Sequence, residues 1–230
     1  SAVNSINWAR VMAQVVYYYT AIEQLHAVDS GPVSFSVPTG NFGNVLAGWI
    51  ARQLGANVGH LIVGSNSNDI LTRFFETQQM TTAPVVPTLS PSMDIGVSSN
   101  FERLLFEMNG RDGAATADQI ATFRTTGNMA VTADQFGTWI RPVFRGQRCS
   151  DAETTAMIAA TYRNHGVLVD PHTAVGLVAT QACATPDEPV VTLATAHPAK
   201  FADAVEHETQ KLSESSAMLE ALLADVPVGV

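Results

Sequence analysis

Apolar residues recur every three or four positions along the first part of the chain, which is the spacing of an α-helix that buries one face. Between Ser5 and about Leu25 they are Ile6, Ala9, Met12, Ala13, Val16, Tyr19 and Ile22. We expect these residues to form the buried face of a long helix. Asn4 or Ser5 can cap its first turn, because short polar side chains accept hydrogen bonds from the free amides there.

Further along the chain, short apolar runs alternate with segments of helical periodicity. Strands are expected at residues 33–37, 60–63 and 189–194. Helices are expected at residues 45–54, 69–77, 100–108, 151–165, 173–182 and 214–224. This alternation favours a mainly parallel sheet flanked by helices, so the predicted fold class is α/β.

Two stretches lack a clear period. Residues 81–99 are rich in Pro, Ser and Thr, and are expected to form an extended loop. Residues 110–148 are more polar and less regular, and we expect a small helical insertion there.

Composition narrows the functional classes. The net charge is −9 and the 12 basic residues are spread singly, so no nucleic-acid partner is expected. No apolar run approaches the roughly 20 residues that span a bilayer, and no secretory signal pattern is present, so we expect no membrane partner and a cytoplasmic protein. Cys149 and Cys183 lack metal-ligand spacing, so no metal site is expected.

The strand-to-helix junction at residues 39–44 (TGNFGN) is the strongest candidate site. Its glycines, Gly40 and Gly43, can adopt positive φ and let backbone amides approach an anion, and the following helix adds free amides. The motif matches neither GxxxxGK[ST] nor GxGxxG, so a small phosphorylated cofactor fits better than a nucleoside triphosphate. An ordinary strand-to-helix turn is the alternative.

A second candidate anion site lies at the start of the first helix. Arg10 provides forked donors suited to phosphate or carboxylate, and Asn4 and Ser5 add neutral donors. The alternative is a capped helix with a solvent-facing arginine. Two anion sites in one chain would suit an enzyme that handles a phosphorylated substrate on a phosphorylated cofactor.

Six motifs together resemble the threonine synthase family, in particular its bacterial and fungal branch. They are SINWAR at 5–10, PTGNFGN at 38–44, SPSMDI at 90–95, SSNFER at 98–103, DPHTAVG at 170–176 and TAHPAKF at 195–201. The resemblance implies pyridoxal-phosphate fold type II (tryptophan synthase β-like). It also implies conversion of O-phospho-L-homoserine and water to L-threonine and phosphate.

The resemblance further implies roles for individual residues. The cofactor phosphate would be held by Gly40, Asn41, Phe42, Gly43 and Asn44. The hydroxyl of Thr195 would face the pyridine nitrogen of pyridoxal phosphate. The substrate phosphate would be gripped by Asn4, Ser5 and Arg10. Residues 170–173 would lie near the cofactor ring, and we expect His172 and His197 to be held by hydrogen bonds rather than to carry protons.

In this family, the lysine that forms the Schiff base with pyridoxal phosphate lies upstream of SINWAR. Lys200 and Lys211 are the two lysines of this chain, and neither takes that place, so no catalytic residue is assigned. We therefore expect residues 1–230 to be the C-terminal part of the large cofactor domain, incomplete without the N-terminal region and inactive alone. A threonine-synthase-like phospholyase and a noncatalytic phosphate-binding or subunit-contact module are the alternatives.

Overall fold

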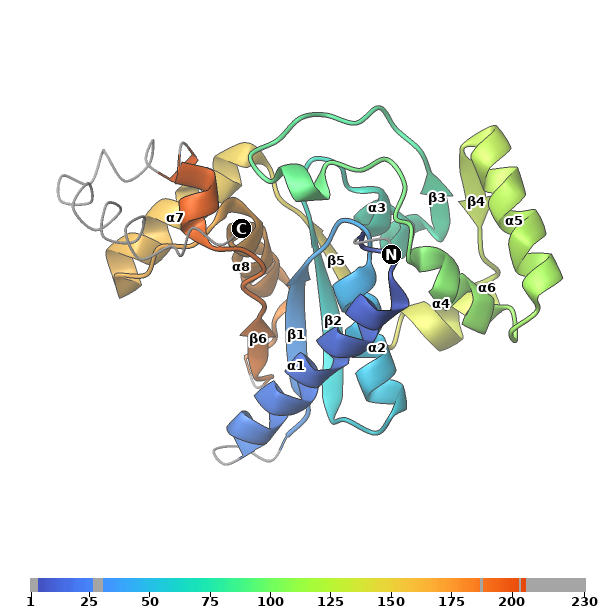
Figure 1. Ribbon diagram of the computed structural model, residues 1–230, viewed down its shortest axis with the longest axis horizontal. Helices are drawn as coiled ribbons and strands as arrows, with labels where there is room; N and C mark the ends of the chain where they lie inside the picture. Colours follow the sequence, from blue (N-terminus) through green and yellow to red (C-terminus); the bar gives the residue numbers. More distant parts are fainter. Residues whose placement is uncertain (1–3, 27–30, 187, 203, 206–230) are drawn as a thin grey trace.

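The computed structural model of the chain describes residues 4–26, 31–186, 188–202 and 204–205 (Figure 1). Its α-helices are α1 Trp8–His26, α2 Gly43–Gln53, α3 Ile70–Thr77, α4 Phe101–Met108, α5 Gly113–Thr126, α6 Ala133–Gln135, α7 Asp151–His165 and α8 Pro171–Cys183. Its strands are β1 Val33–Pro38, β2 Val58–Ser65, β3 Gln79–Thr81, β4 Asn128–Ala130, β5 Phe144–Arg148 and β6 Val190–Thr192. Short turns of other helix types lie at η1 Pro91–Met93, η2 Phe136–Ile140 and η3 Pro198–Phe201.

Four parallel strands form the central sheet in the order β5-β2-β1-β6. Strand β1 is buried along its whole length, and Ser36 at its centre pairs with Ile62 on one side and Thr192 on the other. The apolar residues of β1 alternate with Ser34 and Ser36, which are also fully buried, and β2 contains the apolar run at residues 61–63, so these two strands were recognisable in the sequence. The predicted α/β class with a mainly parallel sheet is confirmed.

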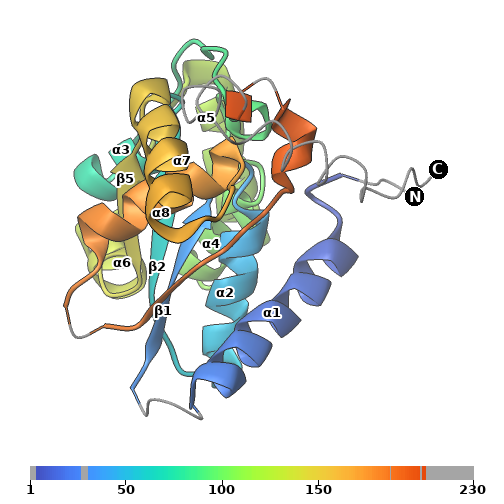
Figure 2. The same cartoon turned by 90° about the vertical axis from the view of Figure 1, so that its left-hand side faces the viewer.

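Helices cover both faces of this sheet. Helices α1 and α2 lie on one side of β1 and β2, and α7 and α8 lie on the other (Figure 2). Helix α1 packs closely on α2 at Gly48, where an added Cβ would lie 2.5 Å from the Tyr18 ring. The predicted helices that fall within the described residues are all present, with ends shifted by up to three residues. The helix predicted at 214–224 lies outside the described residues.

Residues 110–148 differ from the predicted helical insertion. They contain α5 and α6, but also β4, which pairs with β3 in a small antiparallel sheet, and β5, which joins the central sheet. Strand β5 has the sequence FRGQR, with one apolar residue, and is an edge strand whose side chains are mostly half-buried. Neither an apolar run nor a strict alternation therefore marked it.

The buried face of α1 also differs from the prediction. Ile22 is buried as expected, but the other buried residues of this helix are Val11, Val15 and Tyr18. Met12, Val16 and Tyr19 are exposed, with Val16 at 59%. Both sets have helical spacing, so periodicity alone could not decide which stripe faces α2. We call the exposed set, together with Trp8, the α1 stripe.

The start of α1 is capped by a residue other than those predicted. The Asn7 side chain accepts a hydrogen bond from the backbone N–H of Ala9 at 2.9 Å, because the helix begins at Trp8 rather than at Ser5. Within the described part of the chain, no helix is long and apolar enough to cross a membrane.

Candidate functional site

The loop at residues 39–42 connects the carboxyl end of β1 to the first turn of α2. The N–H of Thr39 still bonds the carbonyl of Gly64, so the loop leaves the sheet beside the end of β2. Helix α2 then begins at Gly43, with no acidic residue in its first turn. In open parallel sheets, ligands bind outside the carboxyl ends of the strands, so this loop lies where a site is expected.

The left-handed position of this loop is Phe42, not Gly40 or Gly43 as predicted. Phe42 has φ 61°, which is uncommon for a bulky side chain. Its ring is 1% exposed and packs against Phe101 and Phe144 at centroid distances of 5.6 and 5.7 Å. Burial of the ring thus holds a backbone conformation that the sequence pattern had assigned to the glycines.

The first turn of α2 presents backbone donors toward this loop. Its N-cap residue, Phe42, has no side chain that can accept a hydrogen bond, and among the described residues no acceptor bonds the N–H of Gly43, Asn44 or Val45. The N–H of Leu46 is the first to be satisfied, by the carbonyl of Phe42 at 2.9 Å. Free amides at the positive end of a helix dipole favour an anion.

A cavity of about 240 Å³ lies in front of these amides. It is lined by Ser5, Arg10, Gln14, Pro38, Thr39, Gly40, Asn41, Phe42, Gly43, Asn44 and Ser92. The one charged lining residue is Arg10, which forms no ion pair with any residue in the described ranges. Apart from Asn4 and Thr195, the residues predicted for the two anion sites therefore line one cavity, whose lining carries one positive charge and no carboxylate.

The SSNFER motif joins the two parts of this cavity. The Asn100 side-chain amide donates to the carbonyl of Ser5 at 3.0 Å and to that of Asn41 at 2.8 Å. The Ser98 hydroxyl donates to the carbonyl of Gly40 at 2.8 Å. Sequence reasoning recognised this motif but gave it no role. The sequence carried no signal for these contacts, because the burial of Asn100 and its backbone partners follow only from the fold.

Two predicted site residues lie outside the cavity lining. The Asn4 side chain accepts a hydrogen bond from the N–H of Ile6 at 3.3 Å. Thr195 is exposed and follows β6, whose carboxyl end lies beside that of β1 at the same edge of the sheet. No lysine lines the cavity: Lys200 is exposed in η3, and Lys211 lies outside the described residues.

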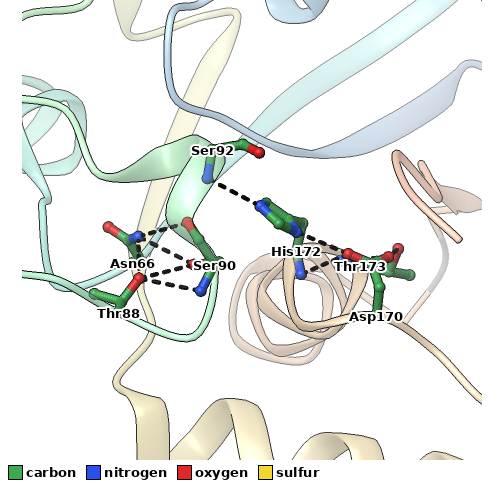
Figure 3. Close-up of polar contacts among 7 residues, drawn as sticks. All are labelled: Asn66, Thr88, Ser90, Ser92, Asp170, His172 and Thr173. Carbon is green, nitrogen blue, oxygen red and sulfur yellow. Dashed lines mark hydrogen bonds and ion pairs between the residues drawn. The ribbon is translucent and has the colours of Figure 1, made fainter. Parts of the chain in front are cut away.

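Residues 170–173 begin α8 and are held by one buried carboxylate. Asp170 is fully buried and accepts hydrogen bonds from the backbone N–H of His172 and from the Thr173 side chain. Burial alone would raise the pKa of Asp170, but the hydrogen bonds from His172 and Thr173 outweigh it and lower the pKa. His172 is held by hydrogen bonds, as predicted: its Nδ1 lies 2.8 Å from Asp170 Oδ1, and its Nε2 lies 3.3 Å from the N–H of Ser92 (Figure 3).

This architecture places the chain in a class of protein. A solved threonine deaminase from T.th. shares the fold with a TM-score of 0.52 at 10% identity, over 80% of this chain and 55% of that chain. The chain thus has an α/β domain of pyridoxal-phosphate fold type II, in which a helix N-terminus follows a central strand at the carboxyl edge of the sheet.

Sequence similarity then identifies the family. Residues 173–226 match the sequence model of the family described as threonine synthase, C-terminal. Threonine synthase of Pseudomonas aeruginosa is 52% identical over 206 residues, which are 89% of this chain and 44% of that protein. PLP-bound threonine synthase from Brucella melitensis has a TM-score of 0.87 at 45% identity, over 97% of this chain and 48% of that chain. The chain belongs to the threonine synthase family and corresponds to its C-terminal portion.

The match covers nearly all of this chain but only part of its relatives. The chain spans about half the length of the curated relatives that it matches, between 44% and 49% for the P. aeruginosa and Corynebacterium glutamicum threonine synthases.

Proposed function

We propose that this chain supplies the phosphate-binding part of a pyridoxal-phosphate enzyme that converts O-phospho-L-homoserine and water to L-threonine and phosphate. The observation that carries the proposal is the cavity shared by the first turn of α2 and Arg10. Its lining contains several neutral donors and one cation but no carboxylate. A phosphate needs convergent donors and no nearby acid, so these residues fit the phosphate of the cofactor.

The cofactor and the protein have different tasks in this proposal. Pyridoxal phosphate supplies the electron sink that stabilises a carbanion of the substrate. The amides of Gly43, Asn44 and Val45 bind its phosphate, and Thr195 supplies a neutral hydroxyl toward the ring nitrogen. Ser5 and Arg10, with Asn4 beside them, orient the phosphate of the substrate so that it leaves with its charge compensated.

The protein partner in this proposal is the portion of a threonine synthase that the match does not cover. That portion would bring the lysine that handles protons at the reacting carbons, since no lysine lines the cavity in the described part of the chain. The α1 stripe supports a contact with it: Trp8 is 51% and Val16 59% exposed, next to Met12 and Tyr19. Contiguous exposed apolar side chains commonly mark an interface.

Calorimetry of the 230-residue chain tests the proposal. Inorganic phosphate and pyridoxal phosphate should both bind and compete with each other, whereas pyridoxal without its phosphate should bind at least tenfold more weakly. The chain alone should release no phosphate from O-phospho-L-homoserine. Equal affinity for pyridoxal with and without phosphate would contradict the assignment of the cavity, and threonine formation would contradict the need for a partner.

A noncatalytic phosphate-binding module is the second candidate, because the cavity holds donors suited to an anion but no lysine and no carboxylate line it. It predicts tight phosphate binding that adding the missing portion of a relative does not convert into turnover. Mixing the chain with the amino-terminal portion of the P. aeruginosa relative, followed by a phosphate-release assay, separates the two functions.

A further inference from the structure

The turn at residues 90–93 presses directly on the loop that carries the candidate phosphate site. A Cβ added to Gly40 would lie 2.8 Å from the carbonyl oxygen of Ser92 and 3.2 Å from Cα of Met93. Ser92 also lines the cavity. The place of this turn therefore limits where the backbone of Gly40 can lie, and with it the direction of the amides that follow.

Hydrogen bonds hold this turn from two sides (Figure 3). On one side, the Asn66 amide donates to Thr88 Oγ1 at 2.8 Å, to Ser90 Oγ at 3.0 Å and to Asp94 Oδ1 at 2.8 Å. On the other side, Nε2 of His172 accepts the N–H of Ser92 at 3.3 Å. The hydrogen bonds of Asn66 join the turn to a residue that precedes it in the chain, whereas the hydrogen bond of His172 joins the turn to the start of α8.

The partners of His172 define its protonation. A backbone N–H can only donate, so Nε2 must be the unprotonated nitrogen. The proton then lies on Nδ1, where it is donated to Asp170 Oδ1 at 2.8 Å. The imidazole is 4% exposed and also packs against the Phe201 ring at a centroid distance of 4.8 Å. Both its tautomer and its orientation are therefore set by neighbours.

We infer that His172 is a positioning residue for the phosphate site. As a neutral imidazole protonated on Nδ1, it accepts a hydrogen bond from the N–H of Ser92. This bond fixes the turn at residues 90–93, and with it the backbone of Gly40, relative to the start of α8. It touches neither of the proposed anions. The inference rests on the proposed function, because it assigns His172 to the same cavity.

Two substitutions separate positioning from a general effect on stability. In His172→Gln, the side-chain oxygen can take the place of Nε2 and still accept the Ser92 N–H, but the donor to Asp170 is lost. In His172→Asn, the amide can replace Nδ1 and still donate to Asp170, but the acceptor for Ser92 is lost. The two variants therefore keep opposite halves of the link.

The two variants are expected to differ in opposite ways in phosphate affinity and in thermal stability. Affinity for inorganic phosphate, measured by calorimetry, should stay within about twofold in His172→Gln and fall by about three- to tenfold in His172→Asn, which is the loss expected for one neutral hydrogen bond. The thermal midpoint should fall more in His172→Gln, because buried Asp170 loses a donor. A purely structural role would make affinity follow stability in both variants, and that result would overturn the inference.

Two NMR measurements test the link without any phosphate. The imidazole nitrogen shifts of the wild-type chain should report Nδ1 protonated and Nε2 bare; the opposite tautomer would overturn the inference. Hydrogen exchange of the Ser92 amide should speed up in His172→Asn and not in His172→Gln. If the wild type binds no phosphate while this exchange pattern holds, the proposed function fails and the link between α8 and the turn stands. Unchanged phosphate affinity in both variants would leave the proposed function in place and overturn the inference.

Discussion

The two ends of the central sheet differ in how their polar groups are paired. At the amino ends of the strands, Glu188 meets groups from three strands. Its carboxylate lies 2.7 Å from Nδ1 of His60 in β2 and 3.2 Å from Nη1 of Arg145 in β5, and it accepts a hydrogen bond from the Ser34 hydroxyl of β1. Arg145 also donates to the carbonyl of Cys183 at 2.7 Å. The charged and hydrogen-bonding groups at this end are therefore paired with one another.

At the carboxyl ends, donors converge without matching acceptors. The amides that open α2 and the guanidinium of Arg10 face one cavity, and no carboxylate lines it. Buried or half-buried polar groups in native proteins are almost always paired, so donors left over at one place indicate a ligand. The comparison teaches that charge by itself does not mark a site in this fold: the charged groups around Glu188 pair with one another, whereas the amides that open α2 have no acceptor among the described residues.

The pKa of Glu188 reflects the same difference. Burial alone would raise it, but hydrogen bonds from Ser34 and His60, with the charges of His60 and Arg145, lower the pKa of Glu188 to about 2. A perturbed carboxylate often indicates catalysis, yet structural ion-pair networks perturb pKa values as well. Here the partners belong to the sheet itself, at the end away from the cavity, so we assign Glu188 to stability.

The largest effect at the carboxyl end is expected from Phe42→Ala. This change removes the ring that anchors the left-handed residue of the loop in the core, against Phe101 and Phe144. We expect the free energy of unfolding, measured in urea, to fall by about 3 kcal/mol, together with loss of phosphate binding. Leu54→Ala is the control, because its side chain is 62% exposed and should change stability by less than about 0.5 kcal/mol. Equal urea midpoints for the two variants would contradict anchoring by the ring.

At the amino end, Glu188→Gln should reduce stability and leave the site unaffected. Because its pKa is lower in the folded chain than the usual 4.5, ionised Glu188 stabilises the fold fully above about pH 4.5, and this contribution disappears as the pH falls toward 2. We expect the variant to lose about 2 kcal/mol of unfolding free energy at pH 7 and to show a flatter decline below pH 4.5.

Urea unfolding at several pH values measures that decline, and phosphate titration at pH 7 provides the contrast. A loss of phosphate affinity in Glu188→Gln, with the fold intact, would mean that the two ends of the sheet are coupled. If the unfolding free energies of the variant and the wild type changed with pH in the same way, ionised Glu188 would not contribute to stability at the amino end.

A smaller effect, on binding rather than stability, is expected from Asn100→Asp. The change replaces an amide that donates to the carbonyls of Ser5 and Asn41 with a carboxylate that repels both. We expect phosphate affinity to fall by about tenfold, since the two parts of the cavity separate and a negative charge lies near the anion. Asn109→Asp is a matched control, because that amide donates to Thr116 and Gln119, away from the cavity. An equal loss in both variants would indicate a general effect of the substitution.

Most of the layered fold could be predicted from the sequence because burial leaves a pattern. The apolar residues of β1 alternate with buried serines, and β2 contains the apolar run at residues 61–63. Ser150, the N-cap of α7, and Glu153 three residues later form a capping box that marks a helix start. Edge strand β5 carries no such pattern, and α1 carries two apolar stripes of equal spacing. Which stripe faces α2 depends on tertiary packing, namely the fit of the Tyr18 ring over Gly48.

The backbone loop of the candidate site could be proposed from the sequence, but the residues that hold the loop in place could not. Glycines and a helix start pointed to the loop at 39–44, but the left-handed residue is Phe42, whose conformation is held by distant rings. The contributions of Asn100, Ser92 and His172 come from segments far apart in sequence that meet only in the fold. A single sequence contains no local pattern that indicates such long-range contacts.

The smallest effect is expected from Arg10→Gln. Arg10 is exposed, so water and salt screen its charge, and an exposed charge pair contributes only about 0.2–1 kcal/mol. We therefore expect inorganic phosphate to bind about threefold more weakly in this variant at about 0.15 M salt, with a larger difference at low salt.

Arg163→Gln changes the net charge equally from an exposed position on α7, and serves as the control. If both variants weaken binding equally, the effect comes from the overall charge of −9 and not from the cavity. A loss in Arg10→Gln alone would place the charge of Arg10 at the anion, and the donors at the carboxyl end would then differ from the paired charges around Glu188 in function as well as in geometry.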